Sequence, residues 1–326
     1  MPKSISDLQK KYLDSLSQLN YPEVPGNLYE PVQYLLALGG KRIRPVMVLA
    51  GADMFSGNLE DAMNMSHAVE FFHNFSLMHD DIMDDADLRR GSATVHTKYD
   101  VNTAILSGDV MLIYAYRFIE AYEPQKLTKL FTLFNQTAIQ ICEGQQWDVD
   151  FETRKDVVID DYLQMITYKT AVLLGASLQF GGIVAGADEK DQGHLYNFGK
   201  NIGIAFQVQD DILDVFADTV ASGKKKAGDI LQKKKTYLYL KSLELLSETQ
   251  AQRLQFLFSD QVEVEGSKLI KETMALFNDC HVKVYAQELK ENYQQLGLSH
   301  LQMIGRPEED KKALLEFAEN LLNRQH

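Results

Sequence analysis

The 326-residue chain has little that interrupts a helix and little that could cross-link the fold. Only seven prolines are present, so long helices can run without the breaks that this residue imposes. Its two cysteines, Cys142 and Cys280, lie far apart and belong to no Cys-x-x-Cys or Cys/His ligand pattern. The sequence therefore indicates neither a disulfide framework nor a zinc site, and we expect a reducing, cytoplasmic location.

Positive charge is also scarce. The chain has 33 basic and 46 acidic residues, a formal net charge of -13. A field of this sign repels polyanions, so we expect no nucleic-acid partner and no binding to anionic membranes. An anionic substrate must instead be captured by a local group of cations. The first 18 residues are polar and lack the apolar core of a signal peptide, so we expect the mature protein to keep them.

Neither alternating strand patterns nor a Pro-, Gly- or Ser-rich linker divides the chain, and hydrophobic residues make up 45% of it. We therefore predict a single all-α domain over residues 1–326, built from about ten or more helices with short connections. Apolar residues recur at steps of three and four through residues 28–38, 43–55, 60–83, 101–121, 127–147, 159–186, 192–216, 234–258, 263–291 and 310–323.

One segment is long enough to suggest a membrane span. Residues 170–187 carry no charge over 18 positions, which meets the lower length limit for a transmembrane helix. The segment also contains Ser177, Gln179 and four glycines. We therefore predict a helix buried inside the bundle and no stable membrane insertion.

Two aspartate clusters, DDIMDD at 80–85 and DDILD at 210–214, stand in apolar periodic stretches 130 residues apart. At about 100° per residue, helix positions i, i+1 and i+4 share an arc of about 100°. Carboxylates crowded in this way repel one another unless cations neutralise them, and Mg²⁺ prefers such oxygen ligands. A single cluster would be explained by a solvated acidic face, but two favour metal sites. The predicted metal ligands are Asp80, Asp81, Asp84, Asp210, Asp211 and Asp214.

Basic residues gather at three other places. The turn GGKRIRP at 39–45 carries Lys41 and Arg44, which can grip a phosphate. Arg89 and Arg90 follow the first acidic cluster, where one guanidinium can reach an anion held by metal. Alternatively, the GGKRIRP turn is only a solvated turn. Arg89 and Arg90 could instead form salt bridges to Asp85 or Asp87.

The third basic place is the lysine-rich segment that follows the second acidic cluster, SGKKKAGD at 222–229 and KKKT at 233–236. Most of these lysines fit an exposed loop, yet a loop beside an acidic metal site can also close on a diphosphate. We select Lys224 and Lys234 for that role. Two anion-binding groups together with two acidic clusters indicate two diphosphate substrates.

These motifs resemble those of the trans-isoprenyl diphosphate synthases, the head-to-tail prenyltransferases that elongate isoprenoid chains. The resemblance covers residues 39 to 236. It rests on GGKRIRP (39–45), HDDIMDDADLRRG (79–91), GD (108–109), GQ..D (144–148), KT (169–170), FQVQDDILDV (206–215), GK (223–224) and KKT (234–236).

The resemblance implies an all-α fold around a central cavity, usually as a homodimer, and a role for each motif. It places Asp80, Asp84 and Asp210 on a cluster of three Mg²⁺ ions that holds the allylic diphosphate, supported by Asp81, Asp211 and Asp214. It places Arg89, Lys169, Lys224 and Lys234 on the same diphosphate, and Lys41, Arg44, His73 and Arg90 on isopentenyl diphosphate. Lone pairs of Thr170, Gln207 and the Lys169 carbonyl would face the allylic carbocation.

The chain departs from the family pattern at Ala93, where proline is common, and in both lysine motifs, GKKKAGD and Lys233-Lys234. The sequence therefore leaves open which lysine of each run contacts diphosphate.

By the same resemblance, product length depends on Phe75 and Ser76, five and four residues before the first aspartate. One aromatic residue followed by a small one, without an insertion in the motif, resembles enzymes that make the C20 product. On a helical wheel Ser76 lies about 40° from Asp80 and Phe75 about 140°, so the role of Phe75 depends on the resemblance. Phe71 and Phe72 could also form the floor of the product pocket. We expect geranylgeranyl diphosphate, with farnesyl diphosphate as the alternative.

Three other functions share part of this pattern. A class I terpene cyclase needs one diphosphate site and could dispense with GGKRIRP and His73. A head-to-head synthase also has two aspartate motifs, but GGKRIRP and the lysine segment favour head-to-tail elongation. A non-catalytic subunit of a heteromeric synthase typically loses Asp or Arg at the motifs, whereas this chain keeps them.

Overall fold

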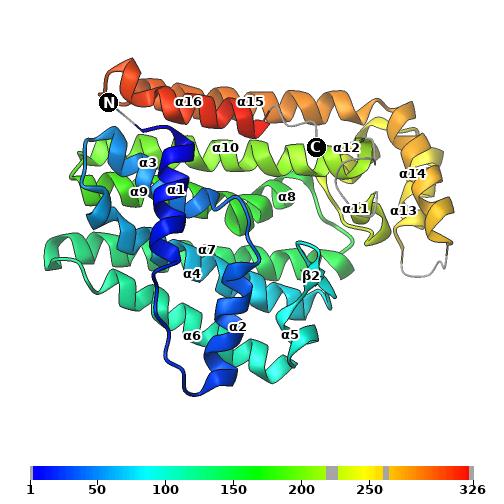
Figure 1. The fold of residues 1–326 in the computed structure, drawn as a ribbon. Helices are drawn as coiled ribbons and strands as arrows, with labels where there is room; N and C mark the ends of the chain where they lie inside the picture. The colour runs from blue at the N-terminus through cyan, green and yellow to red at the C-terminus, as the bar shows by residue number, and fades with distance from the viewer. Residues whose placement is uncertain (1–2, 218–226, 260–263, 323–326) are drawn as a thin grey trace. The chain divides into compact units, whose positions relative to one another are not determined.

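The computed structural model describes residues 3–217, 227–259 and 264–322 (Figure 1). Nearly all regular structure in these ranges is helical, which confirms the predicted fold class. The exception is a small antiparallel hairpin, β1 (Leu88–Arg89) and β2 (Ser92–Ala93), in which Leu88 pairs with Ala93.

The chain divides into two compact units. Unit 1 contains Met1–Asn135, Ala176–Tyr196 and Ile304–Leu314, and unit 2 contains Gln136–Gly175, Asn197–Met303 and Leu315–His326. The single domain expected from the sequence stays a prediction.

Unit 1 is organised around α4 (Leu59–Met83), which packs against α3 (Ile43–Met54) and α6 (Val101–Ile119). Asn58 begins α4 by accepting a hydrogen bond from the amide of Glu60. Buried residues such as Phe71 and Phe72 line most of the helix, because neighbouring helices cover more than one of its faces. Around these three helices lie α1 (Ile5–Leu16), α2 (Gly26–Ala37) and α5 (Val95–Lys98).

Unit 2 has its own hydrophobic core, with Tyr162, Phe277 and Leu254 among its buried members. Within this unit α12 (Tyr237–Leu245) contacts α8 (Ile159–Ile166), α13 (Glu248–Leu257), α14 (Gly266–Asp279) and α15 (Val282–Met303). The other elements that belong wholly to this unit are the π-helix η1 (Thr167–Ala171) and α11 (Gly228–Leu231).

Four further helices supply residues to both units, because the unit boundaries fall within them. These helices are α7 (Pro124–Thr153), α9 (Val172–Ala185), α10 (Glu189–Phe216) and α16 (Glu308–Leu322).

The predicted helices agree with the structure through most of the chain, with two corrections. The segments 234–258 and 263–291 are each two helices, not one. The first divides at Ser247, which forms a capping box with Gln250, and the second at His281, whose φ is 52°. Helices α1, α5 and α11 and the hairpin were not predicted.

The uncharged segment is buried, as predicted. Ala171, Leu178 and Phe180 have no exposed surface, and the run 159–186 forms α8, η1 and α9 in succession. Among the helices that the structure describes, none is long and apolar enough to cross a membrane.

Helices α3 and α9 approach closely in unit 1, and two glycines make this possible. A Cβ atom on Gly181 would lie 2.1 Å from the Val48 carbonyl oxygen, and one on Gly51 would lie 2.4 Å from that of Leu178. Both obstacles are backbone atoms, which cannot rotate away.

We predict that Gly181→Ala lowers the free energy of unfolding by about 2–3 kcal/mol, because the added methyl group overpacks this crossing. Denaturant unfolding of the purified protein measures the change. Gly193→Ala on α10 is the matched control, since a Cβ there meets nothing within 4 Å. It should be neutral or stabilise by up to about 1 kcal/mol through helix propensity. Equal losses in both variants would contradict the packing argument.

Candidate functional site

The first aspartate motif lies at the end of α4 in unit 1. Asp84 is the C-cap, and the last turn contains no basic residue. The carbonyl end of a helix carries partial negative charge, so carboxylates are unfavourable there unless cations offset them. This placement favours binding of a metal ion.

The three predicted ligands of this motif differ in environment. Asp81 is 2% exposed, and Arg89 from β1 grips it in a bidentate pair, with Nε at 2.7 Å from Oδ2 and Nη2 at 2.6 Å from Oδ1. Arg89 thus pairs with Asp81 and not with Asp85 or Asp87. Asp80 is partly exposed and Asp84 is exposed. The 100° arc shared by the motif is wide enough for its members to meet different neighbours.

The turn at residues 39–44 gathers the cations that the sequence predicts. Arg44 Nη1 lies 3.2 Å from His73 Nε2 on α4, and Arg90 Nη1 donates to the carbonyl oxygen of Gly39. Gly40, with φ at 115°, makes room for Arg90, because a Cβ there would lie 2.6 Å from its Cζ. Lys41 is exposed, and its carbonyl oxygen accepts a hydrogen bond from Gln9 at 2.9 Å.

This cluster has a strong positive potential. Burial lowers the pKa of His73 well below its ordinary value, and Arg44, Arg90, Arg89 and Arg42 lower it further. His73 is therefore neutral, and its Nε2 accepts from Arg44. Burial also lowers the pKa of Arg44, an effect that Glu70 opposes and Arg90 reinforces. An anion bound here would relieve the repulsion among these cations.

The second aspartate motif lies near the end of α10 in unit 2, again with no basic residue in the last turn. Asp211 is 5% exposed. Its Oδ2 accepts from the Tyr162 hydroxyl at 2.7 Å and its Oδ1 from Gln207 Nε2 at 3.0 Å. Asp214 accepts from the amides of Gly228 and Asp229 at 3.2 and 2.9 Å. Asp210 is the exposed member.

Burial raises the pKa of Asp211 to about 8, and the carboxylates of Asp229 and Asp210 contribute in the same direction. The hydrogen bonds from Tyr162 and Gln207 oppose this shift. A cation beside this motif would favour the ionised form.

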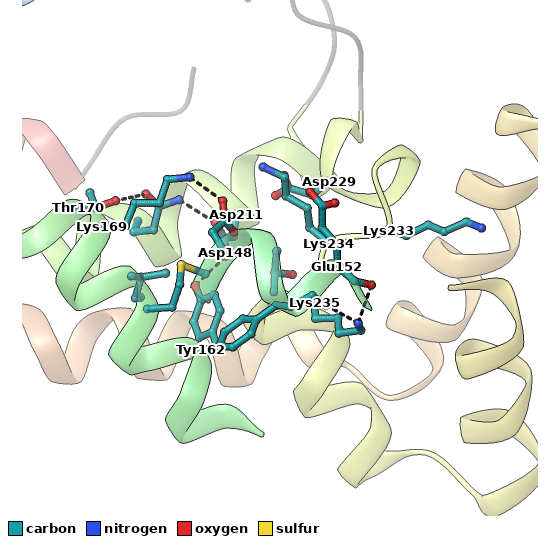
Figure 2. A pocket seen from close by; sticks show the side chains of 15 residues that line it. Asp148, Glu152, Tyr162, Lys169, Thr170, Asp211, Asp229, Lys233, Lys234 and Lys235 are labelled. Atoms are coloured by element: carbon teal, nitrogen blue, oxygen red, sulfur yellow. Dashed lines mark hydrogen bonds and ion pairs between the residues drawn. The ribbon is translucent and has the colours of Figure 1, made fainter. Parts of the chain in front are cut away.

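A cavity of about 160 Å³ in unit 2 contains the remaining predicted catalytic residues (Figure 2). Lys169 Nζ lies 2.5 Å from Asp148 Oδ2, and the Thr170 hydroxyl donates to Gln207 Oε1 at 3.2 Å. Lys169 and Thr170 stand in the π-helix η1, a form that is frequent at functional sites. Gly144 on α7 allows this approach, because a Cβ there would lie 2.3 Å from the Lys169 amide nitrogen.

The structure distinguishes the three lysines of the 233–235 run by their contacts, which the sequence alone could not do. Lys233 donates to the Ser259 carbonyl oxygen at 2.6 Å and points away from the other labelled side chains in Figure 2. Lys235 donates to three carbonyl oxygens at the end of α7, including those of Glu152 at 3.1 Å and Arg154 at 2.7 Å. All three lysines line the cavity, but the amino groups of Lys233 and Lys235 are engaged by backbone carbonyl oxygens, which favours Lys234 for binding a ligand. Lys224 lies outside the described residues.

Asp84 and Asp210 are exposed, Asp80 and Asp214 are half-buried, and Asp81 and Asp211 are buried. Within residues 3–217, 227–259 and 264–322, no three His, Cys, Asp or Glu side chains form a group that could hold a metal ion. The donor set nevertheless fits Mg²⁺, since it consists of carboxylates at helix ends that lack basic residues.

The two residues predicted to set chain length, Phe75 and Ser76, both lie on α4 but contact different groups. Phe75 packs with ring centroids 4.7 Å from His79 and 5.8 Å from Phe72. Phe72 in turn packs edge-on against Phe134. The Ser76 hydroxyl donates to the carbonyl oxygen of His73 at 2.9 Å.

The sequence did not predict two residues of the site, Tyr162 and Asp148. Tyr162, which holds Asp211, stands 49 positions away from it, and no spacing rule relates them. Asp148 belongs to a motif that we identified, but only the fold shows that it meets Lys169.

Known proteins resemble this chain in sequence and in structure. The family model described as Polyprenyl synthetase matches residues 25–276. A curated geranylgeranyl diphosphate synthase of Sulfolobus acidocaldarius is 41% identical over 249 residues, 75% of this chain and 73% of that protein.

Solved structures are similar over the whole chain. A geranylgeranyl pyrophosphate synthase is 44% identical with a TM-score of 0.94, covering 99% of this chain and 100% of that one. The geranylgeranyl pyrophosphate synthase of Corynebacterium glutamicum, solved with isoprenyl diphosphate and magnesium, is 25% identical with a TM-score of 0.82, covering 98% and 97%.

The lysine assignments give a prediction. Lys235→Met should lower the free energy of unfolding by about 1–2 kcal/mol, because it leaves α7 carbonyl oxygens without their charged donor. Lys234→Met should cost less stability than Lys235→Met and should weaken binding of inorganic diphosphate in the presence of Mg²⁺. Denaturant unfolding and calorimetric titration measure the two effects. The assignment is wrong if the two variants exchange these results.

Proposed function

Because the chain belongs to the polyprenyl synthetase family, we propose that it condenses isopentenyl diphosphate head-to-tail with an allylic diphosphate and releases geranylgeranyl diphosphate. The observation that carries this proposal is the cation cluster at the 39–44 turn. It contains Lys41, Arg44 and Arg90, and the neutral ring of His73 is the acceptor for Arg44. One diphosphate can therefore bind without a metal, and a second can bind at the aspartates.

We assign the metal-binding role to Asp80, Asp84 and Asp210, with three Mg²⁺ ions as the resemblance implies. When bound, Mg²⁺ neutralises charge on the departing diphosphate, so that the allylic C–O bond can ionise. The magnesium in the Corynebacterium structure supports magnesium as the ion. Asp81, Asp211 and Asp214 hold the local backbone and side chains, and support the metal directly or through water.

Cationic side chains complete the allylic diphosphate site. Lys169, Lys234, Arg89 and Lys224 supply positive charge to its oxygens. Asp148 fixes Lys169 in an ion pair at 2.5 Å, and Asp81 fixes Arg89 by two parallel hydrogen bonds. Side chains held in this way need little rearrangement as charge develops on the leaving group.

The carbocation left by ionisation needs nearby lone pairs and no water. The Thr170 hydroxyl donates a hydrogen bond to Gln207, and the Gln207 amide donates one to Asp211. This chain of hydrogen bonds orients the Thr170 oxygen with its lone pairs available. The double bond of isopentenyl diphosphate then attacks the cation and forms the new C–C bond. The departing diphosphate accepts the proton that is lost as the product double bond forms.

The C20 product is supported by the names of the relatives and by the Phe75-Ser76 pair. Farnesyl diphosphate remains the alternative product. A cytoplasmic location stays a prediction from cysteine usage.

Incubation with labelled isopentenyl diphosphate, Mg²⁺ and dimethylallyl, geranyl or farnesyl diphosphate tests the reaction. We expect C20 alcohols after dephosphorylation from each starter, and no product when EDTA replaces Mg²⁺. Mainly C15 alcohols would support the alternative product. A cyclic hydrocarbon, or no elongation with any starter, would contradict the proposed reaction.

Asp80→Asn and Asp210→Asn should each lower turnover by about three orders of magnitude, because an amide removes the charge that holds the metal. Circular dichroism should show an unchanged helical fold. Asp85→Asn is the matched control in the same cluster. Its left-handed backbone, with φ at 47°, suits asparagine, and its turnover should stay within threefold. Near-normal turnover in either of the first two variants removes the metal assignment.

We also propose a homodimer formed through α6 and α7. Helix α6 exposes Ile105, Leu106 and Ile113, at 40%, 59% and 62%. On α7, Phe131 is 43% exposed and contacts the ring of Tyr116 on α6. An exposed apolar surface of this kind marks an interaction site in a protein that is otherwise strongly charged.

Ile113→Glu should convert the dimer to a monomer of 37.0 kDa, because association would bury the new charge. Light scattering after size-exclusion chromatography measures the mass. Met303→Glu is the control, since Met303 is a 50% exposed apolar residue on α15, and it should stay dimeric. A monomeric unmodified protein, or a dimeric Ile113→Glu variant, would refute this interface.

A further inference from the structure

A buried ion pair lies beneath the cation-rich turn. Arg42 is 4% exposed and Glu70 is 2% exposed. Arg42 Nη1 donates to Glu70 Oε1, and Arg42 Nη2 donates to the Leu36 carbonyl oxygen. Asn74, one turn further along α4, donates to the same Glu70 Oε1 at 2.8 Å and to the Glu70 carbonyl oxygen at 2.8 Å. The carboxylate is therefore fixed from two sides.

The pair joins three segments of unit 1. Leu36 belongs to α2, Glu70 and Asn74 to α4, and Arg42 is the residue immediately before α3. Arg42 has a φ of 48°, a left-handed conformation that a side chain with a Cβ adopts only when its surroundings hold it there. Lys41 precedes Arg42 directly, and Arg44 stands in the first turn of α3. The backbone conformation at Arg42 therefore sets the directions of both.

Four arginines surround this turn, and the structure divides them into two kinds. Arg42 is paired with Glu70 and Arg89 with Asp81, so two guanidinium charges are balanced by carboxylates. Arg44 meets the neutral ring of His73, and Arg90 meets the carbonyl oxygen of Gly39. The charges of Arg44 and Arg90 thus have neutral acceptors, which an anion can supplement. Arg42 is buried, and its guanidinium group is directed to Glu70 and the Leu36 carbonyl oxygen.

We propose that Glu70 is a positioning residue, which acts through Arg42 to hold the 39–44 turn so that Lys41 and Arg44 meet isopentenyl diphosphate. Asn74 supports Glu70 in this role. The inference rests on the proposed function, and it adds residues that do not touch the substrate. The middle cation of the GGKRIRP motif is therefore structural, whereas its neighbours bind the ligand.

Steady-state kinetics with each substrate varied in turn tests this assignment. Arg42→Lys should raise the KM for isopentenyl diphosphate at least tenfold, because an ammonium cannot reach Glu70 and Leu36 together. Glu70→Gln keeps the shape and both acceptor contacts but removes the charge, and should raise the same KM about fivefold. The KM for the allylic diphosphate should stay within twofold, and kcat at saturation within threefold. The double variant should be no worse than Arg42→Lys alone, because the two side chains act as one unit.

Arg253→Lys is the matched control. Arg253 and Glu272 form a more exposed Arg–Glu pair in unit 2, so this variant should change neither KM. A purely structural role for Arg42 would lower the melting temperature and the active fraction, and would leave the KM for isopentenyl diphosphate unchanged in the folded enzyme. That result overturns the proposal.

Calorimetric binding of isopentenyl diphosphate alone separates two kinds of failure. An unmodified enzyme that neither binds it nor elongates any starter refutes the proposed function, and with it this inference. An active unmodified enzyme whose affinity is unchanged by Glu70→Gln refutes the positioning role alone. If Arg42→Lys does not fold, Glu70→Gln decides, since it is nearly isosteric with the residue it replaces.

Discussion

Repulsion between like charges at helix ends is the constraint on which the site depends. Asp80, Asp81 and Asp84 lie at the carbonyl end of α4, and the second motif lies near that of α10. The fold reduces the repulsion by giving donors to three of these carboxylates: Arg89 to Asp81, Tyr162 to Asp211, and the amides of Gly228 and Asp229 to Asp214. We propose that metal ions offset the remaining repulsion at Asp80, Asp84 and Asp210.

The positive charges near the 39–44 turn are likewise divided between those that a protein group neutralises and those that it does not. The 39–44 turn holds more guanidinium groups than carboxylates, and one of them, Arg42, is neutralised inside the protein by Glu70. Arg44 and Arg90 meet neutral acceptors instead, and we propose that one diphosphate binds there without any metal. Because the chain as a whole is acidic, an anionic substrate must be captured by local groups of cations such as this one.

Helical periodicity and motif spacing predicted the fold class and most helices, because an apolar stripe that must be buried repeats in the sequence. They missed the breaks at Ser247 and His281, where local backbone geometry decides. Spacing also singled out the six aspartates, whose metal-binding role stays a prediction. It could not show that Asp81 turns toward Arg89, that Lys235 caps α7, or that Arg42 is buried. Each of these depends on contacts between residues distant in the sequence.

We propose that one diphosphate binds through cations alone and the other through aspartates and metal. The most direct measurement is calorimetric titration with isopentenyl diphosphate, and separately with an unreactive allylic thiodiphosphate, each with Mg²⁺ and with EDTA. We predict that EDTA leaves the first affinity within about threefold and weakens the second by at least about a hundredfold, since the carboxylates then repel the anion. Equal metal dependence for both ligands would contradict the account.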